Sequence, residues 1–229
     1  MFSFAGEKMR TIAYVDGYNF YHGRIKHTPY KWLDLRALLA GILHAQDPTA
    51  DLVAVKFFTA LIKAPLARLG VQSVNAQQNY HRALELKGVE VVLGKFTLSE
   101  AQAPRRVSGQ PADRDDRVDV WHLGEKQTDV KLALSLYRDA VAARCEQIVL
   151  VTNDSDLAPA LHAVREDCQG IRIGVVLPRP PDLQARRSAT LEEASDWTRH
   201  HILDEELAAH VLPARVPTRK KPIEKPAHW

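Results

Sequence analysis

Short apolar runs alternate with amphipathic stretches along most of this 229-residue chain, and this alternation constrains the fold more than any other feature. Strands that are apolar on both faces and alternate with helices are typical of a parallel sheet covered on both sides. We therefore predict an α/β domain over about residues 9–205. The predicted strands are 11–15, 51–62, 89–98, 148–152 and 171–177, and the predicted helices are 33–43, 71–87, 126–144 and 157–166.

Three segments fall outside this alternation. Residues 1–8 are interpreted as an N-terminal extension and residues 206–229 as a C-terminal segment. The last part, residues 213–229, has five Lys or Arg, one acid and four prolines, so we expect it to be extended and mobile. It is either a solubilising terminus or a segment that contacts phosphate. Residues 99–119 mix four arginines with five acids, and we expect an exposed, functional loop lying over the ligand-binding edge of the sheet.

The composition excludes several classes of protein. With 45% hydrophobic residues the chain can bury a core, and no run approaches the roughly 18 apolar residues that cross a bilayer. The start lacks a signal-peptide pattern, and the two cysteines form neither a disulfide framework nor a CxxC zinc motif. We expect a cytoplasmic protein without a membrane partner, and a homo-oligomer is compatible with the sequence. A net charge of +3 is too small to establish a nucleic-acid partner.

Polar side chains follow two of the predicted strands at the point where each strand ends. Asp16 and Asn19 follow the first strand, and Thr152-Asn153-Asp154-Ser155-Asp156 follows the fourth. In open parallel sheets, ligands bind beyond the carboxyl ends of the strands, so these acids are expected at one edge. The simpler alternatives are that Asp16 belongs to a turn before Gly17 and that Ser155, Asp154 or Asp156 caps the following helix.

A fourth acid, Asp129, lies in the predicted helix 126–144, about 160° around the helix from Lys131 and beside apolar residues. The alternative is a cap at the start of that helix. Four carboxylates at one edge repel one another, and Mg²⁺ or Mn²⁺ relieves that repulsion. Such a centre hydrolyses phosphodiesters without a side-chain nucleophile, and the sequence contains no GxSxG, HExxH or GxGxxG motif.

Three segments resemble the motifs of the NYN domain, a group of PIN-like nucleases that includes LabA-like proteins. They are YVDGYNFY (14–21), KQTDVKLALSLYRDA (126–140) and IVLVTNDSDLAPAL (148–161), within a resemblance that covers about residues 9–200. The resemblance implies a three-layer α/β/α sandwich with a central, mostly parallel sheet, and a metal-dependent ribonuclease. It assigns the acidic metal site, which is also the catalytic site, to Asp16, Asp129, Asp154 and Asp156. Substrate contact or orientation of the site falls to Asn19, Thr152, Asn153 and Ser155.

The sequence therefore predicts an endoribonuclease that acts on single-stranded or looped RNA with Mg²⁺ or Mn²⁺. Two alternatives remain open: a module that binds RNA or protein with little turnover, and a phosphatase or nucleotide hydrolase. Candidate base-stacking residues, each with a core position as its alternative, are Tyr18, Phe20, Tyr21 and Trp32. Candidate phosphate-binding residues are Arg105, Arg106, Arg114, Arg117, Arg179, Arg186 and Arg187, with pairing to Asp113, Asp115 and Asp116 as the alternative for the first four.

Overall fold

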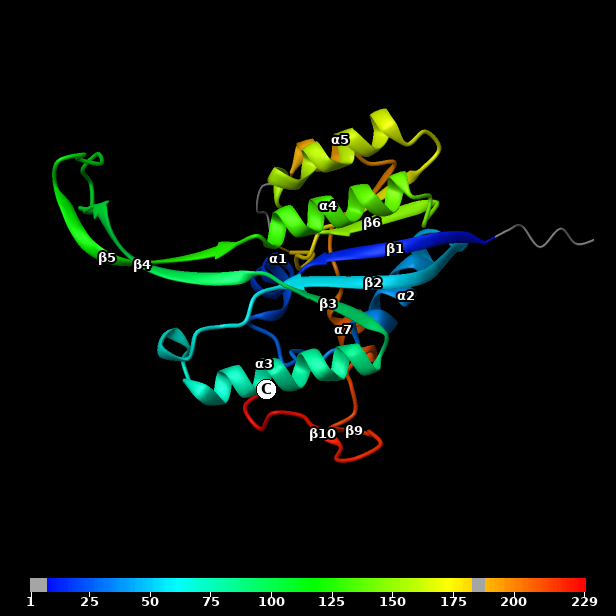
Figure 1. Cartoon of the computed structure of the whole chain (residues 1–229), viewed down its shortest axis with the longest axis horizontal. Coiled ribbons are helices and arrows are strands. Elements are labelled where there is room, and N and C mark those ends of the chain that lie inside the picture. The colour runs from blue at the N-terminus through cyan, green and yellow to red at the C-terminus, as the bar shows by residue number, and fades with distance from the viewer. Residues whose placement is uncertain (1–7, 183–187) are drawn as a thin grey trace, which may run out of the picture.

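The computed structural model describes residues 8–182 and 188–229, and its centre is a six-stranded sheet in the order β3-β2-β1-β6-β7-β8 (Figure 1). All five neighbouring pairs are parallel, as the alternating pattern predicts. The strands are β1 (Met9–Asp16), β2 (Ala50–Thr59), β3 (Val89–Leu93), β6 (Gln147–Val151), β7 (Arg172–Val176) and β8 (Trp197–Arg199). The short strand β8 was not predicted, because it presents three residues with no apolar run.

Helices cover both faces of this sheet and bury one core on each side. Along β1, Ala13 and Val15 pack against one helical layer, whereas Ile12 and Tyr14 pack against the other. The first layer contains α2 (Leu35–Gln46), α3 (Val71–Leu86) and α7 (Asp204–Ala209), and the second contains α4 (Thr128–Val141), α5 (Ala158–Asp167) and α6 (Ala189–Glu193). Shorter turns are α1 (Gly17–Phe20), η1 (Tyr21–Ile25), η2 (Ala64–Leu66) and η3 (Ser155–Leu157). The predicted three-layer α/β/α sandwich is therefore confirmed.

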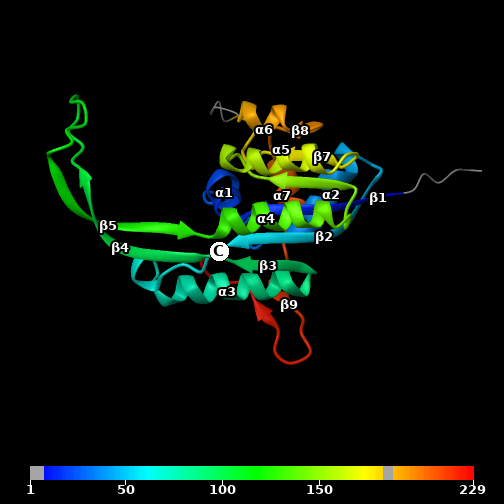
Figure 2. The same ribbon diagram turned by 45° about the horizontal axis from the view of Figure 1, so that its top comes forward.

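The segment that was predicted to be an exposed loop over the edge of the sheet is instead a long antiparallel ribbon. Strands β4 (Lys95–Pro104) and β5 (Arg117–Lys126) pair over ten positions and project away from the body, as both views show (Figures 1 and 2). We call residues 95–126 the arm. The predicted strand 89–98 breaks at Gly94, where a Cβ atom would lie 2.1 Å from Thr128 Oγ1. Polar composition concealed the period-two alternation of the arm, in which Ala101, Ala103, Val118 and Val120 share one face.

The helix that follows the arm begins two residues later than predicted. Gln127 adopts a left-handed conformation with φ 73°, which separates β5 from the first helical residue, Thr128. In the described part of the chain, no helix is long and apolar enough to cross a membrane.

The C-terminal segment is packed against the body, so the prediction of a mobile tail is wrong. Val216 and Ile223 are buried and pair in the small hairpin of β9 (Arg215–Val216) and β10 (Ile223–Glu224). The Trp229 ring lies 6.4 Å from that of Trp32 and 5.6 Å from that of Tyr80. Three apolar residues among the prolines and bases therefore dock the segment, and the charge pattern gave no sign of them.

Candidate functional site

Asp16 is the last residue of β1, and its buried carboxylate is held by two hydrogen bonds. The backbone N–H of Asn19 donates to Oδ1 over 2.9 Å, and Thr152 Oγ1 donates to Oδ2 over 2.9 Å. The first bond caps α1, so the turn interpretation of Asp16 is correct as far as it goes. Gly17 is required here, because a Cβ atom would lie 2.7 Å from the Phe58 carbonyl oxygen. The second bond is not part of a turn, since it reaches from another strand.

The ends of β1 and β6 are joined by further hydrogen bonds among the predicted substrate-binding residues. Asn153 donates its backbone N–H to Asn19 Oδ1 over 2.9 Å, and the Asp154 N–H donates to Thr152 Oγ1 over 3.1 Å. Thr152 is fully buried, and the side-chain oxygen of Asn153 is buried with no hydrogen-bond partner among the described residues. The side chains of Asn19 and Thr152 therefore position the two loops relative to each other.

Asp154 and Asp156 lie on the turn after β6. Asp154 Oδ1 accepts the backbone N–H of Asp156 over 3.0 Å and so caps η3, while Ser155 and Asp156 are exposed. The capping alternative is thus correct for Asp154 and involves one of its two oxygens. It leaves Asp156 without a capping role.

Asp129 lies in the first turn of α4 and is exposed, not on the buried face of the helix. The capping alternative does not hold for this residue, because Gln127 occupies the N-cap position and no side chain caps the helix. Partial burial raises the pKa of Asp129, and the charges of Asp154 and Asp156 raise it further. The helix thus places Asp129 close enough to Asp154 and Asp156 for their charges to repel its own.

The pKa of the buried Asp16 carboxyl also depends on these neighbouring acids. Burial raises the pKa of Asp16 to about 6, the bonds from Asn19 and Thr152 lower it, and the charges of Asp129 and Asp154 raise it again. Asp16, Asp129, Asp154 and Asp156 therefore form one group of mutually repelling carboxylates, which we call the acidic cluster.

The acidic cluster suits a hard divalent cation in donor type and charge, because it offers only carboxylate oxygens with the Asn153 amide oxygen nearby. Within residues 8–182 and 188–229, no three His, Cys, Asp or Glu side chains are arranged so that they could hold a metal ion as they stand. Cation binding would therefore require side-chain rotation, most simply of the exposed Asp129 and Asp156.

One further acid near the cluster was missed by the sequence reasoning. Glu125 is on β5 beside α4, and its Oε1 accepts the Thr128 hydroxyl over 2.5 Å. Burial raises the pKa of Glu125, the bond from Thr128 lowers it, and the charge of Asp129 raises it. Only recognition of the arm as a strand pair would have placed this residue next to Asp129.

Two of the four candidate stacking residues are exposed beside Asp16. Tyr18 is 53% exposed, and its ring lies 4.2 Å from that of His22, against which Tyr21 packs edge-on at 5.2 Å. Burial and the neighbouring charges of Lys26 and His27 lower the pKa of His22, which favours the neutral ring. Phe20 and Trp32 are buried core residues, as their alternative interpretation held.

The candidate phosphate-binding arginines are divided among different environments. Arg105 pairs with Asp116 over 3.2 Å, as the alternative for that segment held, and Arg179 is buried. Arg106, Arg114 and Arg117 are exposed on the arm. Arg186 and Arg187 lie outside the described residues.

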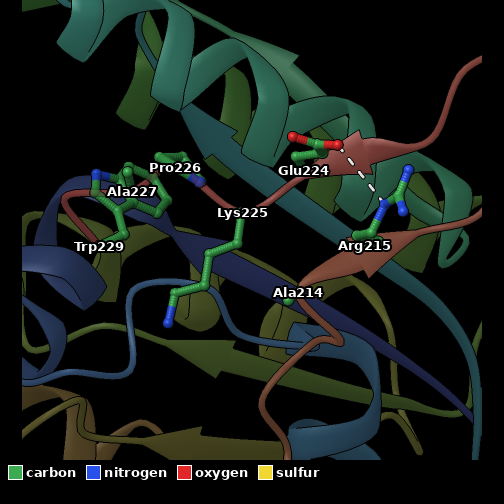
Figure 3. Close-up of a pocket in the computed structure, with 7 residues that line it drawn as sticks. All are labelled: Ala214, Arg215, Glu224, Lys225, Pro226, Ala227 and Trp229. Atoms are coloured by element: carbon green, nitrogen blue, oxygen red, sulfur yellow. Dashed lines mark ion pairs between the residues drawn. The ribbon is translucent and has the colours of Figure 1, made fainter.

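A pocket occurs far along the chain from these acids, in the C-terminal segment (Figure 3). Its wall includes the ion pair between Arg215 and Glu224, in which Arg215 Nε lies 3.6 Å from a Glu224 carboxylate oxygen. The other lining residues are Ala214, Lys225, Pro226, Ala227 and Trp229. None of them belongs to the acidic cluster, so we do not assign the candidate site to this pocket.

This fold, with acids from β1, α4 and the turn after β6 at one edge, defines a PIN-like α/β protein. Residues 10–196 match the NYN domain, and the chain belongs to the NYN domain family. It is 38% identical to the 6-hydroxy-3-succinoylpyridine 3-monooxygenase HspA of Pseudomonas putida over 97% of this chain and 76% of that protein. A crystal structure of a Vibrio parahaemolyticus protein of unknown function has the same fold, with a TM-score of 0.51, 18% identity, and coverage of 90% of this chain and 98% of that one.

Proposed function

We propose that this protein is a metal-dependent endoribonuclease that hydrolyses phosphodiester bonds of single-stranded or looped RNA. The observation that supports this most is the convergence of the four acids of the acidic cluster, in which the pKa of Asp16 is raised to about 6. A partly buried group of repelling carboxylates costs stability unless a cation or hydrogen bonds compensate it. Membership of the NYN domain family agrees with this chemistry.

In this proposal each residue of the site has a stated task. Asp16, Asp129, Asp154 and Asp156 would hold Mg²⁺ or Mn²⁺, which when bound activates water and stabilises charge on the leaving oxygen. Thr152 and the Asn19 N–H keep the Asp16 carboxylate in place through their two hydrogen bonds. Asn153 and Ser155, on the turn after β6, would contact substrate or orient the site. The exposed Tyr18 ring offers an unpaired base a surface to stack on.

A second candidate function follows from the sequence relationship to HspA. That protein is named as a monooxygenase acting on 6-hydroxy-3-succinoylpyridine. The two sequences are 38% identical in an alignment that covers 97% of this chain. Monooxygenation consumes O₂ and two electrons from a reductant, whereas phosphodiester hydrolysis consumes only water. The two reactions are therefore distinguished by what they use up.

The deciding experiment runs both reactions on the same preparation. One arm follows a 5′-labelled single-stranded RNA with Mn²⁺, Mg²⁺ or EDTA, beside a panel of nucleotides and phosphate monoesters. The other follows O₂ uptake with NADH and 6-hydroxy-3-succinoylpyridine. Internal RNA cleavage that stops in EDTA supports the endoribonuclease. Phosphate release from small substrates indicates a phosphatase, RNA binding without cleavage indicates a binding module, and substrate-dependent O₂ uptake indicates the monooxygenase.

A further inference from the structure

The arm carries an apolar patch on one face, although it lies away from both cores. Residues directly opposite each other in an antiparallel pair share a face, and Leu98 lies opposite Leu123. Trp121 is on the same face, two positions nearer the tip, and is 65% exposed. A two-stranded ribbon is only marginally stable by itself in water. A patch with a tryptophan this exposed is therefore typical of an interaction surface.

The outer face of α4 carries a second apolar surface. Val130, Leu134 and Val141 are 62%, 55% and 57% exposed, and their spacing of four and seven residues places them in one stripe along the helix. The opposite face of α4 is already used, since Leu132 and Leu136 are buried against the sheet. We call the three exposed residues the α4 stripe.

Within one chain the arm does not reach the α4 stripe. Only Gln127 separates β5 from α4, and the arm and the helix run in opposite directions from that junction in both views (Figures 1 and 2). The arm also bends toward the side of the sheet that carries α4 and α5. This geometry suits the arm to the helix of a neighbouring molecule.

Charge favours a second copy of this chain over a polyanion as the partner. The arm has six basic and six acidic residues and is therefore neutral, whereas an RNA-binding arm would be basic. The face with Trp121 also carries the acids Glu100, Asp119 and Glu125 and the base Arg117, and is therefore acidic overall. One flank of the α4 stripe carries Lys131 and Arg138, at 100° per residue around the helix. The charged residues that border the two apolar surfaces are thus mainly acidic on the arm and basic beside the α4 stripe.

We propose that the protein forms a two-fold dimer in which the arm of each copy packs on the α4 stripe of the other. Because each copy supplies both surfaces, the contact is made twice. A stable interface buries about 800 Å² per partner, and a single buried tryptophan contributes on the order of 150–250 Å². Two arms with Trp121 at their centre, together with two α4 stripes, supply enough apolar side chains to bury an area of that order. This inference does not depend on the proposed catalytic activity.

Sedimentation velocity of the full chain tests the dimer. Wild type should sediment at twice the 25.7 kDa chain mass, and Trp121→Ser and Leu134→Glu should each sediment as monomers. The matched control is Val71→Ser, which removes a 64% exposed apolar side chain from α3 and should leave the dimer intact. Circular dichroism melting should show all three variants folded, because the altered side chains are exposed.

Disulfide trapping then identifies the contact itself. In a Cys168→Ser background that keeps Trp121 and Leu134, the double variant Glu100→Cys/Arg138→Cys places one cysteine beside Trp121 on the arm and one beside the α4 stripe. It should form a covalent dimer on oxidation, and neither single cysteine variant should. A monomeric wild type, or a dimer that persists in either Trp121→Ser or Leu134→Glu, would overturn the proposal. So would a monomeric wild type whose RNA affinity is lost in Trp121→Ser, which would assign the arm to nucleic acid.

Discussion

The Thr152 hydroxyl donates a hydrogen bond to Asp16 Oδ2 over 2.9 Å and accepts one from the Asp154 backbone N–H over 3.1 Å. One buried group thus connects a carboxylate at the end of β1 with the turn after β6, across 136 residues of sequence. These two hydrogen bonds hold the ends of the adjacent parallel strands in a fixed relationship. The position of Asp16 in the acidic cluster is therefore built into the fold.

Replacing Thr152 by valine should weaken the site and the fold together. The variant loses the bond that lowers the pKa of Asp16 and leaves the Asp154 N–H without its partner, at a cost of about 1–3 kcal/mol of unfolding free energy. Calorimetric titration with Mn²⁺ at neutral pH should show weaker binding than wild type. Thr152→Ser keeps the hydroxyl and should bind like wild type. Equal Mn²⁺ affinity in wild type and Thr152→Val would exclude this role.

The free energy of unfolding should decrease as the pH is lowered, because of His81 on α3. Burial lowers the pKa of His81 from 6.5 to about 4, so the unfolded state binds the proton more tightly. The contribution to stability is complete above pH 6.5 and is lost as the pH falls toward 4, by at most about 3 kcal/mol. Urea unfolding between pH 7 and pH 4 should show a shallower dependence of stability on pH for His81→Gln than for wild type. Parallel slopes would mean that His81 titrates normally in the folded protein.

Removing the C-terminal segment should destabilise the protein. A chain ending at Leu212 exposes Trp32 and Tyr80 and loses the buried Val216 and Ile223, each worth on the order of 1.5–3 kcal/mol. The melting temperature should drop clearly. An unchanged melting temperature would show that the packing of residues 213–229 contributes nothing to stability.

The basic charges of that segment can be tested without disturbing its packing. Arg219, Lys220 and Lys221 lie between the two strands of the C-terminal hairpin and are exposed. If they bind phosphate, replacing all three with glutamine should lower the slope of log affinity against log salt by about 0.7 for each phosphate that is no longer neutralised. Single-turnover cleavage at saturating RNA should stay the same. An unchanged slope would leave these residues a role in solubility alone.

The sequence was sufficient to predict the parallel sheet and the positions of Asp16, Asp154 and Asp156 at the ends of β1 and β6, because buried strands have a clear apolar pattern. It was misleading for the arm, whose strands are solvated on both faces and so lack that pattern. Glu125 was missed for the same reason. The docking of Trp229 was also missed, because a contact with Trp32 at a distance of 197 residues leaves no local signal.

Single-turnover cleavage of a labelled RNA by wild type and Asp154→Asn, with and without Mn²⁺, tests the central claim most directly. Asparagine keeps the side-chain oxygen that caps η3, since Asn and Asp cap helices about equally well, so the fold should persist. It removes charge from the acidic cluster. We predict that wild type cleaves internally only with the cation, and that Asp154→Asn loses activity by orders of magnitude while its melting temperature shifts less on adding Mn²⁺. Full activity in Asp154→Asn with an unaltered response to Mn²⁺ would contradict the account.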